Sequence, residues 1–424
     1  MLGGNFWRLW GSASVSSVGD GIRYTAVPLL AAGYTRDPLL LSTVAVAGSL
    51  PWLLFALPFG AVADRYSRRR VMLISHAVRC GVATTLAVFV ALGYRSIPFL
   101  VAMVLALAAF EVLFESAAQS ALPTVVSSQQ LEKANGRMSA SLMFFDEFAG
   151  PPLGALLFGA AVALPFIVDA ASFAVAAVLL ATIPLSMGAP APDRPRTTLR
   201  ADIQEGLRWL RAATVLKALM VLAAAFTVVR AAGLAILVLF ALEVLGTGNL
   251  GFGVLATTLA VGSLAGTFVA PVLVNRLGAR ATLLVSPVVV GGLFVVVGLL
   301  TYPVLVGVVF ALVGVLSMTW QIAAVSTRQR ITPNQLLGRV TGVFRLFAWG
   351  SAPVGALLGG LAGKLLGLSA PFLLGGGLLI AVGLLIAVLP PARAAFDELP
   401  GRRDRPAAAA GVGDGAEPTD GKAP

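Results

Sequence analysis

Cysteine and histidine are almost absent from this sequence. Its 424 residues include one of each, Cys80 and His76. A single cysteine excludes an intramolecular disulfide and a cysteine metal cluster, and a single histidine excludes a histidine metal site. The phosphate-binding pattern Gly-x-x-x-x-Gly-Lys-Ser/Thr is also absent, which argues against work driven by the chain's own ATP hydrolysis. We therefore expect no enzyme activity, no metal and no cofactor.

Charged residues are scarce as well. They make up 12% of the chain, whereas soluble domains carry about 25%. Hydrophobic residues make up 58%, and the mean hydropathy is +0.92. No water-soluble fold buries so much apolar surface, so the composition predicts an integral membrane protein. The net charge of +11 is then expected to face the membrane surface, and we expect no nucleic-acid partner.

Long apolar runs are what the sequence has in abundance. A helix needs about 20 apolar residues to cross a bilayer. Twelve segments meet this length, at 11–33, 39–63, 71–93, 97–119, 136–159, 163–186, 215–243, 250–274, 281–300, 303–326, 338–362 and 370–390. The alternation of a membrane β-barrel is missing. The N-terminus has no compact apolar core with a cleavage site, so we expect the first helix to be retained.

The connections divide the chain into four parts. Residues 1–186 and 215–391 are predicted to form two six-helix bundles. Between them, 187–214 is rich in proline and charge and contains an amphipathic pattern, LRADIQEGLRWLRA, typical of a helix on the membrane surface. The polar tail 392–424 is expected to be disordered.

The distribution of Lys and Arg predicts the topology. With a cytoplasmic N-terminus, the outer loops hold only Arg36, Arg95 and Lys364 of the 30 basic residues. Four more lie inside helices, and the rest lie in inner loops and termini. The positive-inside rule therefore places both termini in the cytoplasm of a multi-pass cell-membrane protein.

The two halves resemble each other. PFGAVADRYSRRRVML follows the second predicted helix, and FVAPVLVNRLGARATLL follows the eighth. NGRMSASLMFFDEFAGPPLGALL and LGRVTGVFRLFAWGSAPVGALL begin the fifth and eleventh. Two parallel six-helix halves are typical of secondary transporters, which rock one half against the other.

These residues resemble the major facilitator superfamily over the whole chain except the tail. The loop after the second helix carries its pattern at Gly60, Asp64, Arg65, Arg68 and Arg69. The resemblance implies an all-α fold of two pseudo-symmetric six-helix bundles and a conformational role for this loop. We expect Gly60 to allow close backbone approach and Asp64 to latch onto the other half, with Asn275 in its place in the second copy.

Other stretches resemble exporters of macrolides and siderophores, namely NFWRLWGSASVSSVGDGIRYTAVPLL, SALPTVV, LEKANG and VDAASFAVAAVLL. DEFAGPPLGA is similar to the packing motif of antiporters in the fifth helix, with Gly150, Pro151 and Gly154 in place. Asp146 and Ala155 replace two glycines of that motif, which weakens the implication of antiport.

Ionisable residues inside membrane helices are functional candidates, because burying them is costly. Asp20 and Arg23 lie one turn apart, and either form a proton or substrate site or only neutralise each other. Glu111 and Glu115 share a face of the fourth helix, where like charges suit a proton carrier, although Glu115 is close enough to the inner end to be merely hydrated.

Further candidates lie in later helices. Asp146 and Glu147 point about 100° apart, so one faces a central cavity and relays protons, or a protonated carboxyl makes an interhelical hydrogen bond. Arg230 attracts an anionic group or balances a carboxylate, and Arg345 partners an acid of the other half. Arg79 lies in the third helix, and for all three arginines the alternative is that the side chain snorkels to an interface.

Three other features have plain structural interpretations. A cap or hydrogen bond is favoured for Asp169, and packing for His76. The aromatic residues of the fifth, seventh, tenth and eleventh helices line an apolar pocket, or face lipid and neighbouring helices.

Together these patterns predict a monomeric secondary transporter that exports small hydrophobic or amphipathic molecules in exchange for protons. Asp20, Glu111, Asp146 and Glu147 are the candidate proton carriers. A proton-coupled importer and a transport-inactive receptor or scaffold are the alternatives.

Overall fold

The computed structural model describes residues 2–183, 208–209, 213–333, 336–390 and 396. Over these ranges the regular structure is helical. The first half comprises α1 (Gly4–Tyr34), α2 (Pro38–Arg65), α3 (Arg68–Ala91), α4 (Ile97–Val125), a 3₁₀ turn η1 (Ser128–Gln130), α5 (Leu131–Met143), η2 (Phe144–Ala149), α6 (Gly150–Ala160) and α7 (Leu164–Ala181). The second half comprises α9 (Thr214–Leu239), η4 (Phe240–Val244), α10 (Asn249–Leu277), α11 (Ala279–Leu299), α12 (Pro303–Ile331), α13 (Leu337–Gly350), α14 (Ala352–Leu366) and α15 (Ala370–Val388).

Each predicted span coincides with a helix or with a continuous run of helices. The fifth span is the run α5–η2–α6, and the eleventh is α13–α14. Ten helices among the described residues are long and apolar enough to cross a membrane. The other two spans, α1 and α5–η2–α6, carry several of the polar residues of the candidate site. The amphipathic helix in 187–214 and the disordered tail 392–424 fall almost entirely outside the described residues, so these features and the domain bounds stay predictions.

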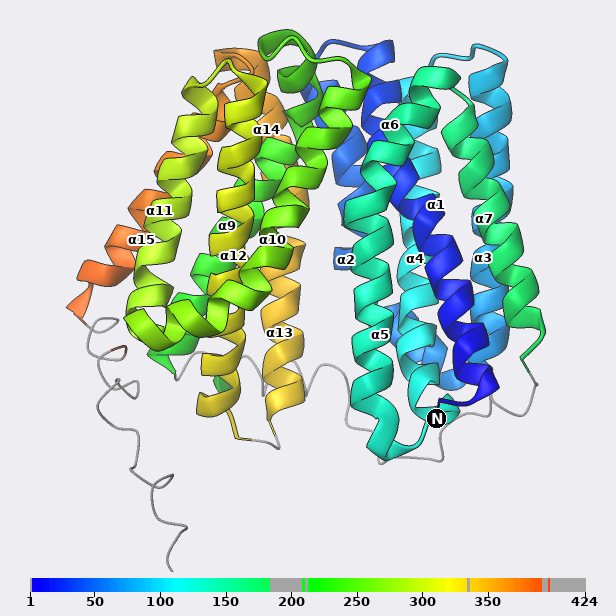
Figure 1. Cartoon of the computed structure of the whole chain (residues 1–424), viewed down its shortest axis with the longest axis horizontal. Helices are drawn as coiled ribbons and strands as arrows, with labels where there is room; N and C mark the ends of the chain where they lie inside the picture. The colour runs from blue at the N-terminus through cyan, green and yellow to red at the C-terminus, as the bar shows by residue number, and fades with distance from the viewer. Residues whose placement is uncertain (1, 184–207, 210–212, 334–335, 391–395, 397–424) are drawn as a thin grey trace, which may run out of the picture.

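The helices run up and down between two ends of the molecule (Figure 1). We call the end at which α1 begins the near end and the end at which it finishes the far end. Local signals set the turns: the Asp37 side chain accepts a hydrogen bond from the Leu39 amide at the start of α2. Gly278 separates α10 from α11 with φ +85°, a conformation that favours glycine.

The internal repeat appears as equivalent helix packing in the two halves. A Cβ atom on Gly154 of α6 would meet the main-chain oxygen of Ile22 in α1. A Cβ atom on Gly355 of α14 would meet the main-chain oxygen of Val228 in α9. Gly154 and Gly355 are the glycines that the two copies of the sequence motif align. In both halves, glycine thus lets the fifth helix contact the backbone of the first.

The two halves, α1–α7 and α9–α15, join at the far end. There a single buried apolar cluster includes side chains of both, such as Leu30, Leu41, Ile236 and Phe240. At the near end the buried clusters are separate, one around Leu9 and Leu122 in the first half and others in the second. Figure 1 shows α5 and α13 standing apart toward the near end. The described structure is therefore closed at the far end.

The polar stretch at 60–70 differs from the predicted loop. Helix α2 continues to Arg65 and α3 starts at Arg68, so the connection is short. The expected close approach at Gly60 is wrong, because a Cβ atom there would meet nothing within 4 Å. The side chain of Asp64 lies outside the described part, so its latch role stays a prediction.

Candidate functional site

Five ionisable side chains, four of them buried and one partly buried, meet in the middle of the first half. They are Asp20 and Arg23 of α1, Arg79 of α3, Glu111 of α4 and Asp169 of α7, which we call the charge cluster. Four spans thus contribute to one site, and none of these residues is near another in sequence except the first two.

Two guanidinium groups organise the charge cluster. Arg23 Nη2 donates to Asp20 Oδ1 at 2.6 Å and to Glu111 Oε2 at 3.0 Å. Arg79 donates to the same oxygen of Asp20 and lies 3.7 Å from Glu111. Its guanidinium also stacks on the ring of Phe173, 4.1 Å from the centroid, and it is only 1% exposed. Arg79 therefore does not snorkel to an interface.

Asp169 joins the charge cluster through Arg23. Its carboxylate lies 3.4 Å from Arg23 Nε and is fully buried, and neither oxygen has a hydrogen bond among the described residues. Gly19 makes room for it, because a Cβ atom there would collide with the Asp169 side chain. The structure thus places Asp169 in the charge cluster, and the favoured interpretation as a helix cap is wrong.

The charge cluster carries unequal charge. Three carboxylates face two guanidiniums, which leaves one negative charge uncompensated when all five groups are ionised. An unbalanced charge in a membrane interior is costly, so one bound proton brings the group to neutrality.

A hydroxyl connects the charge cluster to more open space. Tyr24 donates to Glu111 Oε1 at 2.5 Å, and its side chain is 46% exposed. Ser17, one turn before Asp20, donates to Asp146 of η2. These contacts extend the buried cluster toward partly accessible groups.

The turn that holds Asp146 is a π-helical segment, where the Gly150 amide donates to the Phe145 carbonyl. Such wide turns inside α-helices are frequent at functional sites. Helix α1 presses against this turn, because a Cβ atom on Gly21 would meet the Phe145 oxygen and Gly150. Close packing of Gly21 and Gly150 thus holds the π-helical turn against α1.

The two halves present opposite charge to each other. Glu115 and Glu147 of the first half lie within electrostatic reach of Arg345 and Arg230 of the second. None of these four side chains forms an ion pair within 4 Å in the described part of the chain. Arg345 stacks on Trp349, 4.6 Å from the centroid, and Trp349 meets Trp52 across the halves at 5.9 Å.

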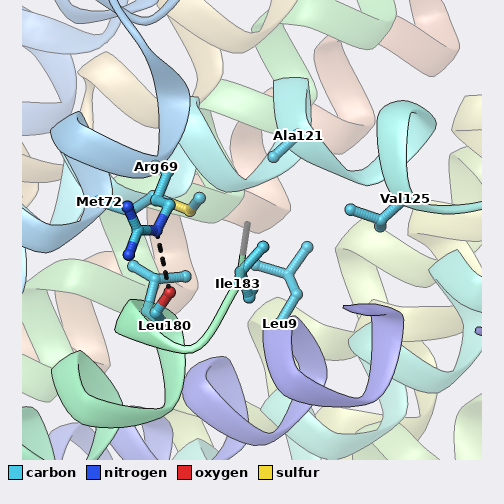
Figure 2. A pocket seen from close by; sticks show the side chains of 7 residues that line it. All are labelled: Leu9, Arg69, Met72, Ala121, Val125, Leu180 and Ile183. Atoms are coloured by element: carbon cyan, nitrogen blue, oxygen red, sulfur yellow. Dashed lines mark hydrogen bonds between the residues drawn. The ribbon is translucent and has the colours of Figure 1, made fainter. Parts of the chain in front are cut away.

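The arginines of the α2–α3 connection lie far from the charge cluster. Arg69 donates to the carbonyl of Leu180 at 3.4 Å (Figure 2). It also donates to the carbonyl of Ala181 at 2.6 Å, at the end of α7. The side chains of Arg69 and Leu180 border a small apolar recess of the first half, which Leu9, Met72, Ala121, Val125 and Ile183 complete. Arg68 is buried and Arg65 is exposed. Arg69 therefore satisfies the last carbonyls of a neighbouring helix.

The structure brings together some of the predicted residues and adds others. Asp20, Arg23 and Glu111 share the charge cluster, and Asp146 accepts a hydrogen bond from Ser17, one helical turn before Asp20. Glu147, Arg230 and Arg345 lie apart, between the halves. Sequence reasoning missed Asp169 and Tyr24 and left Arg79 open. The position of Arg79 and Asp169 deep inside apolar spans could have identified them as site residues. No sequence pattern connects Tyr24 with the charge cluster. In the described residues, no group of three or more His, Cys, Asp or Glu side chains is arranged to hold a metal ion.

Known proteins resemble this chain in sequence. A family model described as "Transmembrane secretion effector" matches residues 3–405. The multidrug efflux pump Tap of Mycolicibacterium fortuitum is 30% identical over 220 residues, which are 50% of this chain and 53% of that protein. Macrolide efflux protein A of Streptococcus pyogenes is 26% identical over 155 residues, 36% of this chain and 38% of that protein. The matches thus span about half, or less, of the length of these relatives.

Solved structures share the fold. A mutant of the nucleoside transporter NupG superposes with a TM-score of 0.76 at 10% identity, covering 92% of this chain and all of that one. A bacterial homologue of the iron transporter ferroportin, in an inward-facing state, gives 0.70 at 18% identity over 93% of this chain and 98% of that one. Because the family model matches nearly the whole sequence and these structures match the fold, the chain belongs to the transmembrane secretion effector family of major facilitator superfamily transporters, which are multi-pass membrane proteins and not enzymes.

Proposed function

We propose that this transporter exports small hydrophobic or amphipathic molecules in exchange for protons. The observation that carries the proposal is the charge cluster, whose three carboxylates and two guanidiniums need one proton for neutrality. The relatives named as a multidrug efflux pump and a macrolide efflux protein support the direction and the substrate class.

The proton enters and leaves the charge cluster through its accessible edge. Tyr24 and Glu111 form this edge, and the hydrogen bond from Ser17 to Asp146 lies one helical turn from Asp20. When the cluster holds no proton, its excess charge is tolerable only with water or a counter-charge nearby. Protonation removes that requirement and permits the cluster to close off. The access of water to the charge cluster is thereby coupled to the protonation of its carboxylates.

Closure at the far end gives the other half of the mechanism. Lys364 Nζ lies 2.6 Å from Asp37 Oδ2, and Arg36 Nη1 lies 3.3 Å from Glu243 Oε1, both across the halves. With both termini in the cytoplasm, this closed end is the outer one, and substrate enters from the cytoplasmic side. Breaking the far-end contacts and joining the near ends then releases substrate outside.

Transport into everted membrane vesicles tests the proposal. An acidic lumen is expected to drive uptake of at least one of three fluorescent probes: cationic ethidium, neutral Nile red and anionic 11-(dansylamino)undecanoate. Valinomycin with equal potassium on both sides removes the membrane potential. Uptake of none of these probes would count against proton-driven export, and uptake under the reversed gradient would identify an importer.

A matched pair of variants locates the coupling. Glu111→Gln removes a carboxyl of the charge cluster, whereas Glu132→Gln removes an exposed carboxyl in the first turn of α5. We expect Glu111→Gln to abolish gradient-driven uptake and Glu132→Gln to retain it. Equal uptake by the two variants would show that the proton-binding site lies outside the charge cluster.

A further inference from the structure

Arg230 is a guanidinium without a counter-ion in its own half. Between residues 215 and 390 the only acidic residue is Glu243. Its carboxylate lies at the far end, 3.3 Å from Arg36. Arg230 lies in the middle of α9, and among the described residues it has no hydrogen bond or ion pair. A charge at this depth is costly unless it faces water, a partner or a ligand.

Arg230 faces the space between the halves. Its side chain is exposed, and Glu147 of η2 lies within electrostatic reach of it without forming an ion pair. Glu147 is exposed as well and has no ion pair in the described structure. Because Arg230 and Glu147 form no ion pair, the guanidinium is available to another anion.

An apolar recess lies beside this guanidinium. It is small, and Gly233, Leu234, Leu237, Leu259, Phe294, Phe310 and Phe372 border it together with Arg230. Leu234 is exposed, whereas Leu237 and the three phenylalanines are buried. A cationic group at the edge of an apolar surface matches a ligand with an anionic head and an apolar body.

We propose that Arg230 binds an anionic group of the transported molecule while the apolar part of that molecule lies against the exposed side chain of Leu234, one turn further along α9. The substrate class is then an amphipathic carboxylate or a similar anion, and this assignment rests on the proposed export function. Glu147 is the group that the substrate anion replaces: it attracts Arg230 when the site is empty and is displaced when substrate binds.

Arg345 is less suited to this role. Its guanidinium already lies against the face of Trp349, and the Trp349 ring contacts Trp52 of the other half. A cation stacked on an aromatic face has part of its charge satisfied. Arg230 has no such contact among those described, so it is the stronger anion site.

Binding to the purified transporter tests the proposal without any proton gradient. The probes are 11-(dansylamino)undecanoate and its primary amide, which differ in charge but hardly in size, and the readout is dansyl fluorescence. We expect the carboxylate to bind about tenfold tighter, or more, because it accepts charge-assisted hydrogen bonds. Arg230→Gln removes this preference, Arg230→Lys keeps part of it, and Lys217→Gln, on the same helix at the near end, keeps all of it.

Several outcomes would overturn the proposal. Equal affinity of the wild-type protein for carboxylate and amide is one, and a preference that survives Arg230→Gln is another. Tighter binding of the corresponding amine would instead indicate a cationic substrate, held by the acidic side chains of the first half, Glu115 and Glu147. If Arg230→Gln does not fold, Glu147→Gln decides: it should tighten carboxylate binding several-fold by removing the competing anion, and unchanged binding overturns the assignment. Since binding needs no gradient, failure of proton coupling leaves these results interpretable.

Discussion

Arg23 Nη2 lies 3.0 Å from Glu111 Oε2, so a single guanidinium joins the first membrane helix to the fourth. The same group contacts Asp20 at 2.6 Å and lies 3.4 Å from Asp169. Three carboxylates therefore depend on Arg23, with Arg79 as the second cation. Any change that adds or removes one charge here alters the balance of the whole charge cluster.

Arg79→Gln should destabilise the protein strongly. It removes a cation that is 1% exposed and leaves three carboxylates with one guanidinium. Breaking a buried ion pair costs about 3–5 kcal/mol. Thermal unfolding in detergent measures the loss, with Arg95→Gln, an exposed arginine at the far end, as the control.

Adding Asp20→Asn to Arg79→Gln should recover part of that loss. The second change removes the carboxylate that the first leaves without one of its partners. If the single variant Arg79→Gln is as stable as the Arg95→Gln control, the ionised form of the charge cluster does not hold the four spans together.

Helix positions follow from the sequence because apolar length decides them. All twelve predicted spans correspond to helices, and the bounds differ by a few residues where polar residues extend a helix beyond the apolar run, as Leu131 to Gly136 do in α5. The π-helical turn at 144–149 could not be predicted, because it depends on the approach of α1 at Gly21.

The candidate site was only partly predictable, for a related reason. Asp20 and Arg23 are one turn apart, so spacing along one helix pairs them. Arg79, Glu111 and Asp169 come from three other helices, and their meeting depends on the depth and rotation of each. Depth is readable from a sequence, but rotation about the helix axis is not when every face is apolar. The close approach expected at Gly60 failed because glycine alone does not say whether a neighbour is near.

Gly154→Val should disrupt the first half, whereas Gly60→Ala should not. Added atoms on Gly154 would meet the Ile22 backbone of α1, and added atoms on Gly60 would meet open space. Overpacking costs about 1–3 kcal/mol, and more when the obstacle is backbone. Thermal unfolding and probe uptake measure both variants. Similar stability of Gly154→Val and wild type would contradict the described contact of α6 with α1.

Arg69→Ala should loosen the end of α7, and Arg70→Ala should leave it unchanged. Arg69 donates to the carbonyls of Leu180 and Ala181, while its neighbour Arg70 is exposed. The loss of charge-assisted hydrogen bonds at a half-buried site is worth about 1 kcal/mol. Hydrogen exchange of the last turn of α7 reports the effect locally. Equal exchange in the two variants would show that Arg69 is not the cap of this helix.

The ion pair between Asp37 and Lys364 should bias the transporter toward closure at the far end. Because the Lys364 ammonium donates a hydrogen bond to Asp37, the pKa of that carboxyl is held below its ordinary value, about 3.9 for a free aspartate. The contact is thus fully present above that ordinary pKa and is lost only as the pH falls through the lowered one. At neutral pH, removing either charge should favour opening, while mild acid should not.

Asp37→Asn is the cleaner test, because asparagine still accepts the hydrogen bond from the Leu39 amide that starts α2. Spin labels on Leu92→Cys and Leu365→Cys, exposed at the far end of the two halves, measure opening in a Cys80→Ser background. An exposed pair is weak, so we expect the open fraction to rise about two- to fivefold. Lys364→Arg keeps the charge and should keep the wild-type distances. A distance distribution that Asp37→Asn leaves unchanged would mean that the apolar cluster shared by the two halves closes the far end without help from this ion pair.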